Sequence, residues 1–151
     1  MRNDPRPEDC AGMARNCLSA SLRRTERIVT RHYDAHLAAS GLTAVQLPIL
    51  ASIASIADPT FRTLAEQLDL DRSTLSRNLA LLSERRLVTI APSAGPKAGR
   101  ISLTPTGRAA LRKAYALWRD AQKELETTLS AGGLADALDL LKALRRAVRP
   151  S

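Results

Sequence analysis

The stretch of sequence that decides the fold is TFRTLAEQLDLDRSTLSRNLALLSERRLVTI, residues 60–90. It contains two runs in which apolar residues recur at helical spacing, one after Thr60 and one after Asp71. Thr and Asp at these positions can cap helix starts, because their side-chain oxygens accept hydrogen bonds from free backbone amides. Only the short segment 69–71 separates the two runs. The stretch therefore predicts two helices joined by a tight turn.

A β-hairpin is predicted directly after these helices. The segments 88–90 and 101–103 each alternate apolar and polar residues, and the loop 91–100 between them contains two Pro and two Gly. A hairpin on its own is only marginally stable in water, so we expect its apolar face to pack on the preceding helices. Together these elements predict a winged helix-turn-helix.

Further helices are predicted on both sides of this unit. Apolar residues at spacings of four and seven predict a helix over about 12–39, and a long helix follows from Pro105. Thr43 and Gln46 have the spacing of a capping box for a short helix, in which Pro48 is expected to distort the first turn. A last helix carries a near-heptad stripe of Leu134, Leu138, Leu141, Leu144 and Val148. We interpret this stripe as a dimer seam, with an intramolecular core as the alternative.

Composition and charge narrow the class of protein. The chain has 151 residues, of which 44% are hydrophobic and 25% charged, which fits one folded, mainly α domain. Its net charge is +8, and it contains 19 Arg but only 4 Lys. The planar guanidinium group of Arg suits phosphate oxygens and guanine edges, which favours a polyanionic partner. Most of the excess charge lies in the segment 72–100, which holds six basic residues and one acidic residue.

The second helix of the predicted helix-turn-helix is the candidate for DNA recognition. In this motif its N-terminal turns enter the major groove, where short polar side chains and Arg reach base edges and phosphates. The candidate residues in these turns are Arg72, Ser73, Thr74, Ser76 and Arg77. Lys97 and Arg100 near the hairpin tip are expected to contact the neighbouring backbone or the minor groove. The alternative is that all of these are ordinary solvated residues on a helical bundle.

Five segments carry a resemblance to a known family. They are GLTAVQL (41–47), LAEQL (64–68), DRSTLSR (71–77), RLV (86–88) and ISLTPTG (101–107). In their order and spacing, over about residues 15–148, they resemble the MarR family of bacterial transcriptional regulators. The resemblance implies an obligate homodimer built from the first and last two helices, and binding to a pseudo-palindromic operator on double-stranded DNA. It also implies release by a small, often aromatic, ligand or by oxidation.

The expected organisation combines the resemblance with the helical pattern. We expect residues 1–10 to form a flexible arm and residues 11–151 to form a single domain. Within this domain, a winged helix-turn-helix lobe over about 42–104 lies between dimerisation helices over about 12–39 and 105–149.

The wing turn departs from the family pattern. The family usually carries Asp-x-Arg there, whereas this sequence has Gly95, Pro96 and Lys97. Lys97 supplies the positive charge of the wing Arg but cannot make the same bidentate contacts.

Cys17 is the candidate redox residue. It lies near the start of the first predicted helix, where amide donors and the helix dipole favour a reactive thiolate. A peroxide-sensing branch of the resembling family uses a cysteine near this place together with tyrosines, and this chain has only Tyr33 and Tyr115. A structural role is therefore favoured. The alternative is a redox-responsive regulator, or a thiol redox protein that uses Cys17.

His32 and His36 are a weak candidate pair for a metal ion. Their spacing of four residues places both imidazoles on one helix face, as in some zinc sites. Two ligands are too few for such a site, although Asp34, Cys10 or a partner subunit could supply a third. We therefore interpret them as surface or interface histidines and expect no metal.

The sequence favours a regulator over an enzyme. It contains no Ser/His/Asp or Cys/His arrangement and no Gly-rich phosphate loop, so neither catalysis nor a cofactor is expected. The two cysteines do not make a disulfide framework, and no apolar run is long enough to span a membrane, which together favour a cytoplasmic protein. The leading interpretation is a sequence-specific DNA-binding repressor. A winged helix that mediates only protein contacts is a further alternative.

Overall fold

The computed structural model describes residues 4–92 and 99–148 of the chain. Five helices precede the hairpin: α1 (Pro7–Asn16), α2 (Leu18–Leu37), α3 (Gln46–Ser55), α4 (Phe61–Leu68) and α5 (Arg72–Glu84). A 3-10 turn, Ala38–Ser40, follows α2. The hairpin strands are β1 (Val88–Ile90) and β2 (Ile101–Leu103), and the chain continues with α6 (Pro105–Thr128) and α7 (Gly133–Val148). The predicted mainly α, winged helix-turn-helix fold is confirmed.

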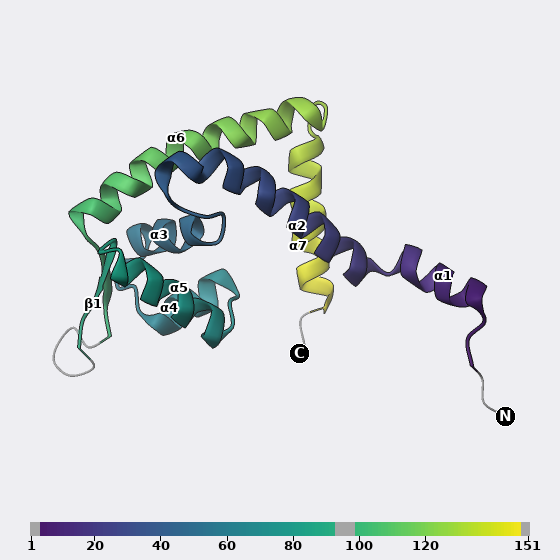
Figure 1. Cartoon of the computed structure of the whole chain (residues 1–151), viewed down its shortest axis with the longest axis horizontal. Helices are drawn as coiled ribbons and strands as arrows, with labels where there is room; N and C mark the ends of the chain where they lie inside the picture. Colours follow the sequence, from purple (N-terminus) through teal and green to yellow (C-terminus); the bar gives the residue numbers. More distant parts are fainter. Residues whose placement is uncertain (1–3, 93–98, 149–151) are drawn as a thin grey trace.

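The elements form a lobe and a set of helices that extends from it (Figure 1). Helices α3, α4 and α5 and the hairpin form the lobe, and α2 and α6 run alongside each other above it. Helices α1 and α7 lead away from the lobe. Neither of these two helices has a buried residue in the single chain.

The hydrophobic core of the lobe contains side chains from α3, α4, α5 and both strands. This shared core positions α5, the candidate DNA-reading helix. Its fully buried side chains include Leu37, Ile49, Leu50, Leu64, Leu75, Leu82 and Ile101. The two strands pair antiparallel with Val88 opposite Leu103, and both of these side chains are buried. The apolar face of the hairpin therefore packs on the helices, as the sequence predicted.

Local hydrogen bonds explain where the helices start. The Thr60 hydroxyl accepts from Thr63 N (3.2 Å), while Thr60 N donates to the Thr63 hydroxyl (2.8 Å). Asp71 caps α5 through Thr74 N (2.8 Å). The predicted caps at Thr60 and Asp71 are therefore both confirmed.

The structure corrects two predictions about the N-terminal part of the chain. Residues 7–10, expected in a flexible arm, belong to α1, which begins with Pro7 at a position where the missing N–H costs nothing. The expected single helix over 12–39 is two helices, because Cys17 adopts an extended conformation (φ −71°, ψ 111°) between α1 and α2.

Pro48 follows an irregular first turn, as the sequence suggested, because residues 44 and 45 form a turn and regular helix begins only at Gln46. The capping-box bonds form, with Gln46 N donating to the Thr43 hydroxyl (3.2 Å) and Thr43 N donating to Gln46 Oε1 (3.4 Å). Leu47 N donates to Thr43 O (3.0 Å), so Pro48 is the fifth residue counted from the cap at Thr43. Pro48 cannot donate the next bond of this series, which accounts for the irregular turn before it.

Candidate nucleic-acid interface

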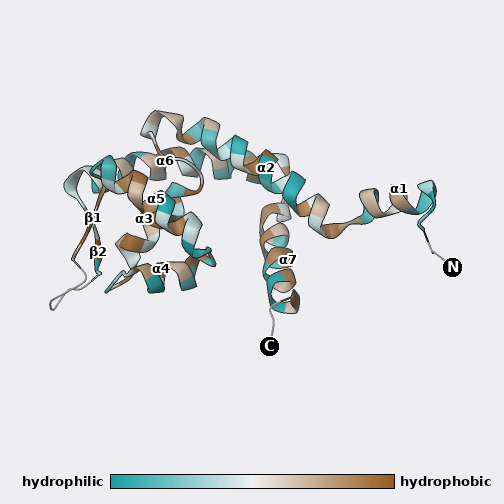
Figure 2. Cartoon of the chain, turned by 60° about the horizontal axis from the view of Figure 1, so that its bottom comes forward, coloured by the Kyte–Doolittle hydropathy of each residue, from teal (hydrophilic) through white to brown (hydrophobic). Residues whose placement is uncertain are grey.

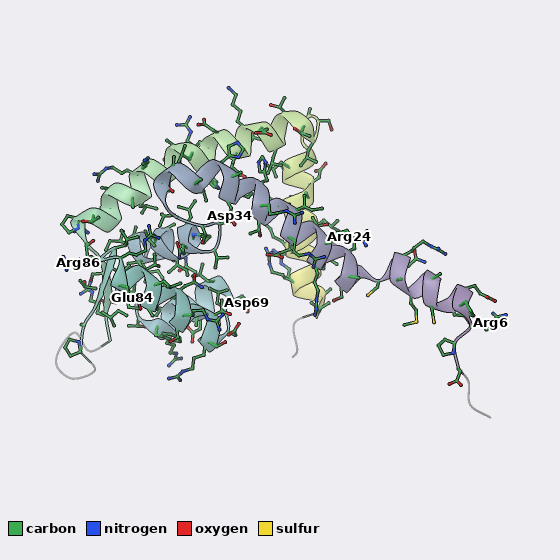
Figure 3. The ribbon with its side chains drawn as sticks, in the orientation of Figure 1. Arg6, Arg24, Asp34, Asp69, Glu84 and Arg86 are labelled. Carbon is green, nitrogen blue, oxygen red and sulfur yellow. The ribbon has the colours of Figure 1, made fainter. Side chains whose placement is uncertain are left out.

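Helices α4 and α5 form a helix-turn-helix held by its turn. Asp69 takes the left-handed conformation (φ 52°) that ends α4, and Leu70 N donates to Ala65 O (3.2 Å). Asp71 then starts α5 at once. Figure 3 labels Asp69 in this turn and Arg86 near the base of the hairpin.

One face of α5 packs into the core of the lobe, and the opposite face is exposed to solvent. Leu75, Leu79 and Leu82 are buried in the lobe and fix the axis of the helix. The exposed side chains of its first two turns are Arg72, Ser73, Ser76 and Arg77, whereas Thr74 is half-buried. The sequence-predicted contacts of α5 are thus brought together on one outward surface, with Thr74 at its edge.

Asp71 organises two of these candidates. Its carboxylate accepts from the Ser73 hydroxyl (2.5 Å), the Thr74 hydroxyl (2.6 Å) and Thr74 N (2.8 Å). Hydrogen bonds from Ser73 and Thr74 hold the pKa of Asp71 far below its usual range, so the cap remains ionised at neutral pH. The two hydroxyl protons are committed to Asp71, which leaves the hydroxyl lone pairs to accept from a ligand.

The two arginines of α5 differ in the contacts that their side chains make within the chain. The guanidinium of Arg72 lies 5.7 Å from the centre of the Phe61 ring, a cation–π contact that orients it across the turn. Within the described parts of the chain, no hydrogen bond or ion pair engages the Arg77 side chain. Arg77 is therefore the most available donor on this surface.

The hairpin is fastened to the lobe at its base. Ile101 N donates to Pro59 O (2.7 Å), which extends the pairing of β2 toward the segment before α4. Arg100 donates to Ala57 O (2.8 Å) and forms an ion pair with Asp58 (3.2 Å). The Arg100 side chain is 37% exposed, so it holds the wing while one edge still faces solvent. Lys97, with Gly95 and Pro96, lies outside the described residues.

Arg85 belongs to the basic segment in sequence but not to this surface. Its guanidinium reaches Gln46 Oε1 (3.5 Å) and lies against Gly41, whose left-handed conformation (φ 72°) ends the turn after α2. The exposed Arg85 side chain is therefore held against the lobe near Gln46 and Gly41.

Comparisons with known proteins agree with this geometry. The model of the MarR family matches residues 40–98. The transcriptional regulator MosR of M. tuberculosis is 34% identical over 89% of this chain and 98% of that chain, with a TM-score of 0.74. The chain belongs to the MarR family. It is thus a transcriptional regulator of that family, as the resemblance implied.

Two solved structures of MarR-family relatives contain DNA. One is MosR in complex with DNA, which is 35% identical over 87% of this chain and 99% of that chain, with a TM-score of 0.71. The other is a mutant of E. coli MarR complexed with operator DNA, which is 26% identical over 87% of this chain and 96% of that chain, with a TM-score of 0.75. The comparison with curated proteins gave no match.

This MarR-family chain also contains an apolar cavity that sequence reasoning missed. The cavity has a volume of about 390 Å³ and lies between α2, α3 and α6. Its lining includes Tyr33, Leu47, Ala51, Leu111, Tyr115 and Trp118. Burial raises the pKa of the Tyr33 phenol, whose hydroxyl donates to Gln122 Oε1. No local pattern indicates such a cavity, because its walls come from three separate helices.

A second, wider cavity adjoins the first. It has a volume of about 870 Å³ and shares Ala51, Leu111 and Tyr115 with the apolar cavity. Its wall also includes Arg100, Arg108 and Arg112. The apolar cavity therefore adjoins a space whose wall carries three arginines, of which Arg100 is already paired with Asp58.

The cysteines do not join either cavity. Cys10 and Cys17 are free and exposed, and Cys17 lies in the extended link between α1 and α2. Within the described residues, no side-chain hydrogen bond from Cys17 caps α2. The redox role of Cys17 remains a prediction.

The two histidines acquire a third neighbour from another helix. His32, His36 and Glu124 present potential ligand atoms that all lie within 4.8 Å of one another. Asp34, one of the expected third ligands, instead accepts a hydrogen bond from Ala44 N (2.6 Å), and Figure 3 shows it on the side of α2 that faces α3. Cys10, another expected ligand, is not part of this cluster.

Among the described residues, no helix combines the length and the apolar character needed to cross a membrane.

Proposed function

We propose that the protein is a homodimeric, sequence-specific DNA-binding repressor that a small aromatic ligand releases from a pseudo-palindromic operator. The observation that carries the proposal is the outward surface of α5, on which Arg72, Ser76 and Arg77 are exposed while the opposite face is locked into the core. The DNA complexes of MosR and MarR support this assignment. The lobe over about 42–104 would bind DNA, and the helices over about 12–39 and 105–149 would form the dimer.

Exposed surface supports the dimer. The single chain exposes 11028 Å², whereas a compact monomer of 16.3 kDa is expected to expose about 7500 Å². The excess exceeds the share of about 1000 to 2500 Å² that each chain contributes to an obligate dimer interface. Figure 2 shows hydrophobic residues on α1 and α7, the two helices that have no buried residues. A second copy of the chain would cover them.

A direct test is to select bound sequences from random duplex DNA and then to measure single-residue variants on the selected operator. Arg77→Ala should weaken operator binding and relax base preference at one position in each half-site by about 1 to 3 kcal/mol, because a bidentate contact to a base is lost. Affinity for each base at that position is the measurement.

Two control variants separate base reading from general charge. Lys97→Ala should weaken binding to all duplexes alike. It should also reduce the slope of the logarithm of affinity against the logarithm of salt concentration by about one. Arg119→Ala removes an exposed charge from α6 and should change neither quantity. If Arg77→Ala bound the selected operator with parental affinity and preference, the assignment of α5 as the reading helix would be wrong.

Ligand release is supported by the two adjoining cavities. We call the proposed dimerisation helices, over about 12–39 and 105–149, the stem. The apolar cavity lies where α2 and α6 of this stem meet α3 of the DNA-binding lobe. An aromatic ring fits its apolar walls, and an anionic group on that ring would reach the arginines of the second cavity. We therefore infer an aromatic carboxylate as the class of effector. Its binding would change the angle between stem and lobe, and so the spacing of the two reading helices.

Filling the cavity should abolish the response to such ligands. Ala51→Phe places a ring in the space between α2, α3 and α6, so aromatic carboxylates should no longer release the operator, while operator affinity stays within about threefold of the parent. Fluorescence of Trp118, the single tryptophan, reports ligand binding directly.

The matched control is Ala116→Phe, which adds the same ring to an exposed position of α6 and should leave release intact. A variant with both cysteines replaced by serine should also keep ligand-induced release. Release by peroxide that disappears in that variant, without any response to aromatic carboxylates, would favour the redox alternative instead.

The proposed DNA-binding function also predicts whether the protein is an enzyme and where in the cell it acts. We infer that the protein is not an enzyme and that it acts in the bacterial cytoplasm, where its DNA target lies. Its membership of the MarR family supports both inferences.

A further inference from the structure

A cluster of metal-binding side chains lies away from the DNA-reading surface and from both cavities. His32 and His36 come from successive turns of α2, and Glu124 comes from α6. Helices α2 and α6 pack side by side (Figure 1), so the cluster joins two elements that are distant in sequence. Two imidazoles and one carboxylate are a donor set that suits zinc and its neighbours in the transition series.

His36 is oriented as a metal ligand. Its Nδ1 lies 3.0 Å from His32 O, a carbonyl that can only accept a hydrogen bond, so Nδ1 carries the proton. The neutral ring then has its lone pair on Nε2. A backbone carbonyl that holds Nδ1–H in this way is the usual partner that fixes the tautomer of a metal-bound histidine.

The Nε2 lone pair of His36 faces a carboxylate. Glu124 Oε2 lies 3.0 Å from this nitrogen, and both atoms are electron-pair donors when the imidazole is neutral. The contact is favourable when a cation or a shared proton lies between the two groups. A metal ion and a proton are thus competitors for the same position.

His32 supplies the third donor. One of its ring nitrogens lies within 4.8 Å of the ligand atoms of His36 and Glu124, and its ring centre is 4.6 Å from that of His36. Its Nε2 donates to Ala121 O (3.3 Å), which holds the ring against α6 and leaves the lone pair on Nδ1. Around a tetrahedral zinc ion, with ligand bonds of about 2.1 Å, neighbouring ligands are about 3.4 Å apart. The His36–Glu124 distance is already close to that value, and small side-chain rotations bring in His32.

We propose that His32, His36 and Glu124 bind one divalent transition-metal ion of the zinc class, with water in the fourth position. The His36 side chain is 26% exposed and that of Glu124 is 59% exposed, so an ion can enter from solvent. Bound there, the ion clamps α2 to α6. The proposal is independent of the DNA-binding function.

Metal titration of the tag-free, chelator-treated full-length protein tests the proposal. Calorimetry with Zn²⁺ should show one ion per chain, and Co²⁺ should produce the visible absorption of a tetrahedral site with nitrogen ligands. Zn²⁺ should also raise the thermal midpoint of unfolding, because it binds only the folded chain at this site. Mg²⁺, which prefers oxygen ligands, should not compete.

Variants identify the ligands. His32→Gln, His36→Gln and Glu124→Gln should each weaken Zn²⁺ binding by at least about tenfold and remove the thermal shift. Glu126→Gln, which removes a carboxylate from the same helix outside the cluster, should bind Zn²⁺ like the parent.

Three outcomes would overturn the site. One is the absence of saturable Zn²⁺ binding, which would mean that only a proton bridges His36 and Glu124. Another is Zn²⁺ binding that is unchanged in all three ligand variants, which would place the metal elsewhere. The third is a Co²⁺ spectrum without nitrogen ligation in the parent protein, a result that does not depend on whether any variant folds.

Discussion

Leu141→Asp is expected to yield a monomer or an aggregate and to weaken operator binding by about 10²- to 10⁴-fold, the advantage that two linked DNA-binding modules have over one. Leu138 and Leu141 on α7 are 45% and 38% exposed in the single chain, although they lie on the leucine stripe. If a second copy covers this stripe, the new carboxylate would be buried without a partner, which costs several kcal/mol. Light scattering and an operator-binding assay are the measurements.

The control for Leu141→Asp introduces the same side chain next to the stripe. Lys142 is exposed and pairs with Asp139 on the surface of α7, so Lys142→Asp should remain dimeric and bind the operator. A soluble Leu141→Asp protein that stayed dimeric with parental affinity would contradict the proposed seam. A parent protein that bound a single half-site tightly as a monomer would contradict the architecture as a whole.

Gly107→Ala is expected to destabilise the fold by about 3 kcal/mol or more, because it forces two backbone segments apart. A Cβ atom at Gly107 would lie 1.9 Å from Leu87 O, and a backbone carbonyl cannot move aside as a side chain can. The same carbonyl accepts a hydrogen bond from Thr104 N (3.1 Å), so any shift also disturbs the start of α6. Urea unfolding at fixed protein concentration measures the change.

Gly12→Ala is the matched control for this prediction. Gly12 lies within α1, where a new Cβ meets no atom within 4 Å, so the substitution should be neutral or stabilise the helix by up to about 1 kcal/mol. If Gly107→Ala unfolded at the same urea concentration as the parent, the close approach of α6 to the segment before β1 would be refuted.

The local elements of the winged helix could be predicted because each depends on residues close together in the chain. Thr60 and Asp71 cap α4 and α5 with their own side chains, and the strands occupy the predicted segments 88–90 and 101–103. The break at Cys17 was not predictable, because the apolar spacing continues across it and only the backbone conformation shows it.

The candidate DNA-reading surface was predictable in part for the same reason. Arg77 and Ser76 are exposed because the leucines of α5 determine which side of the helix is buried. In the sequence, Arg85 and Arg100 contribute to the positive charge of the segment 72–100 in the same way as Arg77. In the structure, hydrogen bonds to Gln46 and to Ala57 O hold their side chains against the lobe. Net charge of a segment does not report the direction of each side chain.

By itself, the sequence indicated the family, the order of the elements from α3 to α7, and the buried side of α5, since periodicity and capping act over a few residues. Only the tertiary structure brought Glu124 to His36 and enclosed the cavity beside Trp118. Both features depend on how α2, α3 and α6 pack together. That packing depends on how side chains from distant segments fit together. The spacing of apolar residues along one helix carries no information about this fit.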